Sequence, residues 1–119
     1  VLGDDIEADY EPLRFGGGYD HNWVLKNEGR FDKVAEVASD KSGIVMEVYT
    51  DLPGVQMYSA NFLDNEPGKD GVSYIKRSAV CLETQYYPDA VHHENFPGPI
   101  CKKGEKYDTR TAYRFLTQG

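Results

Sequence analysis

The stretch IVMEVYTDLPGVQMYSANF, residues 44–62, decides the fold class. Its first seven residues are rich in β-branched and aromatic side chains, which favour a strand. Residues 51–54 place proline and glycine where type I and type II turns accept them. Residues 55–62 are predicted as a second strand, because side chains on a strand alternate between two faces. One face would carry Gln56, Tyr58 and Ala60, and the other Val55, Met57, Ser59 and Asn61.

Strand signals continue on both sides of this stretch. Residues 33–39, 78–85 and 111–115 are predicted as strands, and residues 40–43, Asp-Lys-Ser-Gly, as a hairpin turn. Residues 64–71 are expected to be a loop, as is most of the segment from residue 86 to residue 104. The acidic residues 1–14 are expected to be a loop or an extended arm. Since no window has sustained helical periodicity, the fold class is all-β, an antiparallel sandwich or barrel.

Composition excludes several classes of function. The 119 residues carry 13 basic and 20 acidic side chains, a net charge of −7. Nucleic-acid binding needs a basic surface, so nucleic acid is not expected as a partner. No apolar run is long enough to predict a membrane span, and membrane association is not expected. The chain starts with Val, which suggests a processed product or a fragment, and a cytoplasmic location is expected. The only cysteines, Cys81 and Cys101, are expected to be reduced thiols, although a disulfide between them is possible.

Residues 80–97, VCLETQYYPDAVHHENFP, form the most informative polar segment. Leu82 and Glu83 would face opposite sides of a strand that ends at Tyr87-Pro88-Asp89, where proline removes a hydrogen-bond donor. A carboxylate among apolar neighbours is costly to bury unless it is paired or used, and burial raises its pKa. Glu83 is therefore either an active-site acid or base, or the outward-facing side chain of an edge strand.

Two other polar side chains lie shortly after glycine-containing segments of the chain. Asp20 follows the glycines at 16–18, and Gln56 follows the Leu-Pro-Gly turn. If their strands are neighbours, Asp20, Gln56 and Glu83 would converge on one face, with acceptors and donors that suit sugar hydroxyls. Asp20 is alternatively a turn residue that caps its own backbone. Five aromatic side chains could supply an apolar wall for a sugar: Trp23, Tyr58, Tyr86, Tyr87 and Phe96.

Competing sites have weaker signals. The glycines lack the Lys-Ser/Thr ending and the helix of a phosphate-binding loop. A metal site could use His21, His92, His93 and Glu94, but adjacent residues of an extended chain point apart. No metal is expected.

Four motifs together resemble the C-terminal portion of the aldose 1-epimerase (galactose mutarotase) family. They are GGYDHNWVL at 17–25, VYTDLPGVQMYSANFL at 48–63, LETQYYPDAVHHENFP at 82–97 and YDTRTAYRF at 107–115. The resemblance implies an antiparallel β-sandwich of the galactose-mutarotase type, with residues 1–119 as the C-terminal part of a single domain. It also implies a cofactor-free interconversion of the α and β anomers of a free hexose such as galactose or glucose.

The resemblance also assigns roles to three side chains. Glu83 of the ETQ motif would be the general base, while Asp20 of GYDHN and Gln56 after the Pro-Gly turn would bind the sugar. The family's general acid is a histidine in the middle of a longer chain, and His21, His92 and His93 do not occupy its place. This chain is therefore expected to be a fragment with little activity alone, and the partner implied is the missing N-terminal part of the same protein, supplied as a separate chain. The alternative is a non-catalytic carbohydrate-binding module.

Overall fold

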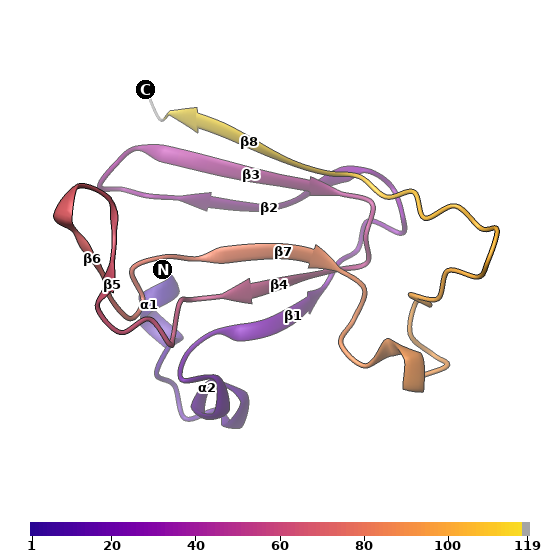
Figure 1. The fold of residues 1–119 in the computed structure, drawn as a ribbon, viewed down its shortest axis with the longest axis horizontal. Coiled ribbons are helices and arrows are strands. Elements are labelled where there is room, and N and C mark those ends of the chain that lie inside the picture. Colours follow the sequence, from indigo (N-terminus) through magenta and orange to yellow (C-terminus); the bar gives the residue numbers. More distant parts are fainter. Residues whose placement is uncertain (118–119) are drawn as a thin grey trace. The chain divides into compact units, whose positions relative to one another are not determined.

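The computed structural model describes residues 1–117 (Figure 1). The chain divides into two compact units, residues 1–23 with 56–83, and residues 24–55 with those from 84 onward. The helices are α1 (Leu2–Asp5) and α2 (Glu11–Gly16), with short 3-10 turns η1 (Lys69–Gly71) and η2 (Ala90–His92). The strands are β1 (Asp20–Val24), β2 (Asp32–Ala38), β3 (Ile44–Thr50), β4 (Gly54–Tyr58), β5 (Glu66–Pro67), β6 (Ser73–Tyr74), β7 (Cys81–Gln85) and β8 (Thr111–Thr117).

The second unit contains an antiparallel sheet with the strand order β2-β3-β8. Strands β2 and β3 form the predicted hairpin, and Gly43 in its turn has a φ of 68°, which glycine adopts without a steric penalty. On its other edge β3 pairs with β8 from Ile44↔Thr117 to Thr50↔Thr111. The side chain of Val48, in the middle strand, is fully buried. The predicted strands 33–39, 44–50 and 111–115 are confirmed within two residues at each end.

The carboxylate of Glu47 lies at the centre of this sheet, and hydrogen bonds from neighbouring side chains compensate for its burial. The Glu47 side chain is only 10% exposed, and it accepts hydrogen bonds from Tyr49 Oη (2.8 Å), Lys33 Nζ (3.2 Å) and Arg114 (3.4 Å). The hydrogen bond from Tyr49, followed by that from Lys33, lowers the pKa of Glu47. The hydrogen bonds from Lys33 to Glu36 and then to Glu47 raise the pKa of the lysine.

A second three-stranded sheet has the order β1-β4-β7, with β4 in the middle. In Figure 1 the arrow of β4 runs opposite to those of β1 and β7. Val55 and Met57 are buried in β4, whereas Gln56 and Tyr58 are half-buried, which confirms the predicted alternation. Leu82 is likewise buried in β7, next to exposed Glu83.

The N-terminal residues differ from the prediction. Residues 1–14, expected to be a loop or an arm, contain α1 and most of α2. Pro12 lies in the first turn of α2, where its missing N–H costs no helical hydrogen bond. Gly17 ends the helix in the left-handed conformation (φ 65°, ψ 20°), and the N–H of Gly18 donates to the Leu13 carbonyl. The start and stop signals were therefore present in the sequence, although hydrophobic periodicity was not.

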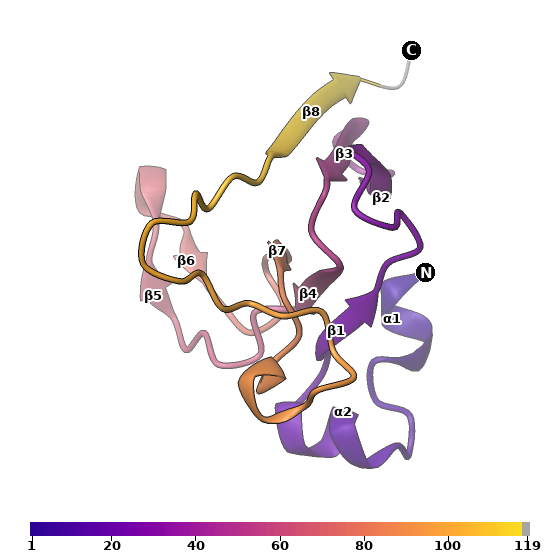
Figure 2. The same cartoon turned by 90° about the vertical axis from the view of Figure 1, so that its right-hand side faces the viewer.

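Three other segments are more regular than expected. Asp20 opens strand β1 rather than acting as an isolated turn residue. The loop predicted at 64–71 contains β5 and η1, and β5 pairs with β6 in a small hairpin that Figures 1 and 2 both show. The long segment after β7 contains the 3-10 turn η2. These elements are two to five residues long, too short for periodicity to reveal them.

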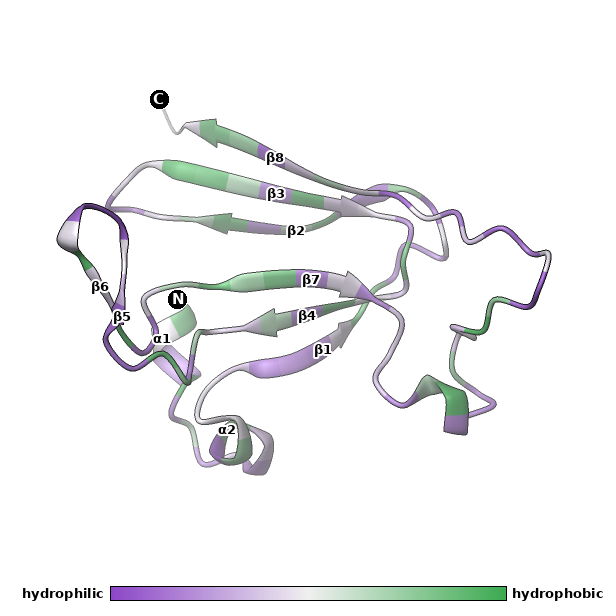
Figure 3. Cartoon of the chain, viewed as in Figure 1, coloured by the Kyte–Doolittle hydropathy of each residue, from purple (hydrophilic) through white to green (hydrophobic). Residues whose placement is uncertain are grey.

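The fold class predicted from the sequence is confirmed. The structure consists mostly of antiparallel strands with few helices. Figure 3 shows hydrophobic residues along β3, β4 and β7, while the start of β1 is hydrophilic. No helix within residues 1–117 has the length and apolarity needed to cross a membrane.

Candidate functional site

Asp20 and Gln56 meet across the pair of strands β1 and β4. Gln56 Nε2 donates a hydrogen bond to Asp20 Oδ1 at 2.8 Å. Gln56 lies on the side of β4 opposite to buried Val55 and Met57, and the Asp20 side chain is exposed. The structure thus brings two of the three predicted site residues together on the outer face of this sheet.

Glu83 lies on β7, the strand on the other side of β4. Because Leu82 is buried, alternation places Glu83 on the outer face, as it places Gln56. The side chain of Glu83 is exposed, as expected for an outward-facing residue of an edge strand. Strand β7 lies at one edge of its sheet, which explains why this side chain is open to solvent.

The backbone just before Asp20 is held by two buried polar side chains, Ser59 and Asn61, which the sequence predicted only as part of one face of a strand at 55–62; strand β4 ends before both of them. Ser59 Oγ accepts a hydrogen bond from the Tyr19 N–H at 3.0 Å, and Asn61 Nδ2 donates to the Tyr19 carbonyl at 2.9 Å. The only signal for this contact in the sequence is the glycine run before Tyr19, which permits a close approach of two segments.

His21 is turned toward its own strand. Its Nδ1 accepts the backbone N–H of Asp20 at 2.9 Å, and its ring packs against Tyr10 and Tyr19. The proton of a neutral ring then belongs on Nε2, which is buried and has no hydrogen-bond partner within residues 1–117. His21 is therefore engaged in local contacts in this structure.

The other two histidines share one carboxylate in the second unit. His92 Nδ1 contacts Asp89 Oδ1, and His93 Nε2 lies 3.4 Å from Asp89 Oδ2. Phe96 packs against both His93 and Tyr87, so two of the predicted aromatic residues contact each other. In the described part of the chain no group of three His, Cys, Asp or Glu side chains has an arrangement that could hold a metal ion. Cys81 and Cys101 are free and exposed there.

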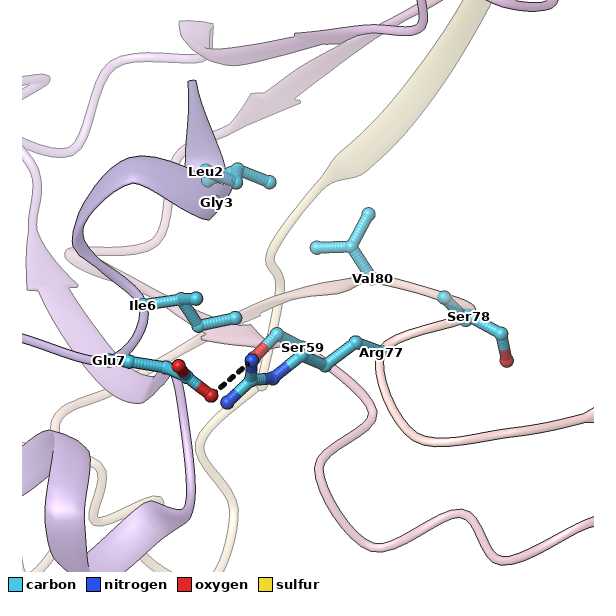
Figure 4. A pocket seen from close by; sticks show the side chains of 9 residues that line it. Leu2, Gly3, Ile6, Glu7, Ser59, Arg77, Ser78 and Val80 are labelled. Atoms are coloured by element: carbon cyan, nitrogen blue, oxygen red, sulfur yellow. Dashed lines mark hydrogen bonds and ion pairs between the residues drawn. The ribbon is translucent and has the colours of Figure 1, made fainter.

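A separate pocket of about 500 Å³ lies in the first unit (Figure 4). An ion pair between Arg77 Nη1 and Glu7 Oε1, 2.9 Å long, lies at its lower side as drawn. Neither Asp20, Gln56 nor Glu83 lines this pocket, so it is distinct from the predicted sugar site. Its lining residues are Leu2, Gly3, Ile6, Glu7, Ser59, Arg77, Ser78, Ala79 and Val80.

Comparisons with known proteins agree with the resemblance found in the sequence. A family model described as aldose 1-epimerase matches residues 1–114. Over 99 residues, 82% of this chain and 29% of the relative, the sequence is 48% identical to the human galactose mutarotase. It is 36% identical to the aldose 1-epimerase of Escherichia coli over 104 residues, 85% of this chain and 30% of that protein.

A solved structure shares the fold. The crystal structure of a GalM/aldose epimerase homologue from C. elegans superposes with a TM-score of 0.76 and 27% sequence identity. The match covers 85% of this chain and 30% of that one. The chain therefore spans less than a third of the length of the relatives it matches.

Proposed function

Because the chain belongs to the aldose 1-epimerase family, we propose that it contributes the base and part of the sugar-binding surface to hexose mutarotation. The substrate is a free hexose such as galactose or glucose, and the reaction interconverts its α and β anomers without a cofactor. The observation that carries the proposal is the hydrogen-bonded pair of Asp20 and Gln56 beside the strand that bears Glu83.

Each side chain suits its proposed role chemically. Glu83 is an exposed carboxylate held on a strand, so it is accessible to the C1 hydroxyl, whose proton it would remove. The Asp20 carboxylate can accept hydrogen bonds from sugar hydroxyls, and the Gln56 amide can both donate and accept. Their mutual hydrogen bond orders the two groups before the sugar arrives, which reduces the entropy lost on binding.

Ring opening also needs an acid. As Glu83 takes the proton from the C1 hydroxyl, the ring oxygen must gain one. The resulting aldehyde then rotates about its C1–C2 bond and the ring closes on the other face. His21 is half-buried and locally bonded, and His92 and His93 pair with Asp89. We therefore assign the acid to a histidine outside residues 1–119, as the family resemblance implies.

The partner implied by this assignment is the rest of an epimerase domain, with residues 1–119 as its C-terminal part. It could belong to the same polypeptide or to a separate chain. The supporting observation is the length match, since this chain corresponds to 29% to 30% of the relatives. By itself the chain is expected to accelerate mutarotation little or not at all.

A chimera tests the proposal. In the human galactose mutarotase, the 99-residue segment that matches this chain is replaced by the residues aligned with it here. Polarimetry then follows the rate at which fresh α-galactose changes its rotation. We expect the chimera to be active and Glu83→Gln to reduce its rate about 10²- to 10⁴-fold, the usual contribution of general acid–base catalysis. Glu94→Gln, which removes an exposed loop carboxylate, is the matched control and should change nothing.

Binding is measured separately with the 119-residue chain. A titration with galactose followed by ¹H–¹⁵N NMR should shift the signals of Asp20, Gln56 and Glu83. An active chimera with an unaffected Glu83→Gln variant would exclude Glu83 as the base. Sugar binding without any turnover in the chimera would instead favour a non-catalytic carbohydrate-binding module.

A further inference from the structure

A closed ring of hydrogen bonds holds the peptide group immediately before Asp20. The Tyr19 N–H donates to Ser59 Oγ (3.0 Å), and the Ser59 hydroxyl lies 2.6 Å from Asn61 Oδ1, to which it donates. Asn61 Nδ2 donates to the Tyr19 carbonyl (2.9 Å), which also accepts the Ser59 N–H (3.0 Å). Both backbone polar groups of Tyr19 are thus bonded to a two-residue clamp, Ser59 and Asn61, each only 5% exposed.

The local backbone is shaped to make this clamp. Ala60, between the two clamp residues, has a φ of 50°, a left-handed conformation that is uncommon for alanine. Its carbonyl is held in turn by the N–H of Arg77 at 3.0 Å. On the opposite side Gly18 has a φ of 145°, and a Cβ there would lie 2.3 Å from Asn61 Oδ1. Only glycine at residue 18 therefore allows the Asn61 amide to reach Tyr19.

The clamp acts one peptide bond away from the Asp20 carboxylate. Because a peptide unit is planar, fixing the Tyr19 carbonyl also fixes the direction of the Asp20 N–H. That N–H is bonded to His21 Nδ1, so the unit is held at both ends. Only the φ angle and the two side-chain torsions of Asp20 then separate the clamped peptide group from the 2.8 Å hydrogen bond to Gln56.

We propose that Asn61, assisted by Ser59, is a positioning residue that sets the Asp20 carboxylate against Gln56 for sugar binding. Its effect on the Asp20–Gln56 pair follows from the structure alone, and its effect on the sugar rests on the function proposed above. Asn61 acts through Asp20 and does not touch the sugar. Without the clamp, Asp20 and Gln56 would sample other arrangements, and sugar binding would have to restore the paired one.

The first measurement needs no sugar. In ¹H–¹⁵N spectra of the 119-residue chain, the side-chain NH₂ signals of Gln56 report its hydrogen bond to Asp20. Asn61→Ala should shift these signals part of the way toward their positions in Asp20→Ala, and Asn95→Ala, at an exposed loop asparagine, should leave them unchanged. Ser59→Ala, a smaller change that also opens the ring, should shift them in the same direction. Unmoved Gln56 signals in a folded Asn61→Ala or Ser59→Ala variant would overturn the proposal.

The second measurement is a double-mutant cycle on galactose affinity. Asn61→Ala should weaken binding about 2- to 10-fold, the equivalent of one net hydrogen bond. In an Asp20→Ala background the same substitution should have no further effect, because there is no carboxylate left to position. An equal loss in both backgrounds would show a merely structural role and refute positioning. If the unmodified chain binds no galactose and the chimera is inactive, the proposed function fails, while the Gln56 signals still decide whether the clamp orients the pair.

Discussion

The hydroxyl of Thr50, at the end of β3, offers a sharp test of how the second unit is held together. Thr50 is fully buried, and its Oγ1 accepts the Leu52 N–H at 3.1 Å and donates to the Arg110 carbonyl at 3.0 Å. The substitution Thr50→Val is nearly isosteric but removes both hydrogen bonds, together with the 3.2 Å contact between Thr50 Oγ1 and Thr111 Oγ1. Thr111 is exposed, so its hydroxyl can bond to water instead. The Arg110 carbonyl would retain the hydrogen bond from the Asp51 N–H at 3.3 Å. The Leu52 N–H, in contrast, would lose its hydrogen bond to Thr50 Oγ1.

The expected loss follows from these two bonds. A buried donor without a partner costs about 1 to 3 kcal/mol, and the second bond contributes roughly 0.5 to 1.5 kcal/mol. We therefore expect Thr50→Val to lower the free energy of unfolding by about 2 to 4 kcal/mol. With a urea m-value of about 2 kcal/mol/M, typical of a small domain, the midpoint should fall by roughly 1 to 2 M.

Urea titrations followed by circular dichroism provide the measurement. Thr50→Ser keeps the hydroxyl and loses one methyl group, so it should cost less than Thr50→Val. Thr117→Val makes the same chemical change at an exposed position of β8 and should be nearly neutral. The reasoning is refuted if Thr50→Val is also nearly neutral, or if Thr50→Ser costs as much as Thr50→Val.

Three further predictions concern other buried groups. Val48→Ala should lower the free energy of unfolding by about 2 to 3 kcal/mol in the same urea assay, because it empties a fully buried site. Gly18→Ala should cost about 2 kcal/mol or more, because its Cβ would meet Asn61 Oδ1 and its φ of 145° disfavours alanine; equal midpoints for variant and parent would contradict this. Since the pKa of Glu47 is lowered by Tyr49 and Lys33, its ionised form stabilises the fold above its unfolded value of about 4.5. This contribution is lost as the pH falls through the folded value, so Glu47→Gln should flatten the acidic part of a stability–pH profile.

The strands that could be predicted are those whose side chains alternate or whose turns have a chemical signature. Residues 44–50 were predicted as a strand to the residue, because β-branched side chains fill them and turn signals bound them. The alternation of Val55, Gln56, Met57 and Tyr58 was also visible, because one face of β4 is buried and the other is not. Strand β1 was missed because its first three residues are polar, and because its two half-buried residues, His21 and Asn22, are adjacent and so show no alternation between faces.

The candidate site was predictable in its residues but not in its geometry. The motifs identified Asp20, Gln56 and Glu83, and the adjacency of β1 and β4 made the Asp20–Gln56 contact possible. The exposure of Glu83 depends on the strand order, which the local pattern does not contain. The clamp depends on a left-handed alanine and on a contact between residues some 40 positions apart, and neither has a signature in single-residue propensities.

The pairing of β3 with β8 has a consequence for the order of events during synthesis. Thr50 and Thr111, which meet in this pairing, are 61 residues apart. At ribosomal rates of about 5 to 20 residues per second, β3 emerges roughly 3 to 12 s before its partner is made. The β2–β3 hairpin closes in about 1 to 10 μs, but without β8 it is a two-stranded hairpin of marginal stability with one edge of β3 unpaired. We expect stalled chains that end near residue 104 to be cleaved by protease along β3, and chains long enough to release β8 to be protected there.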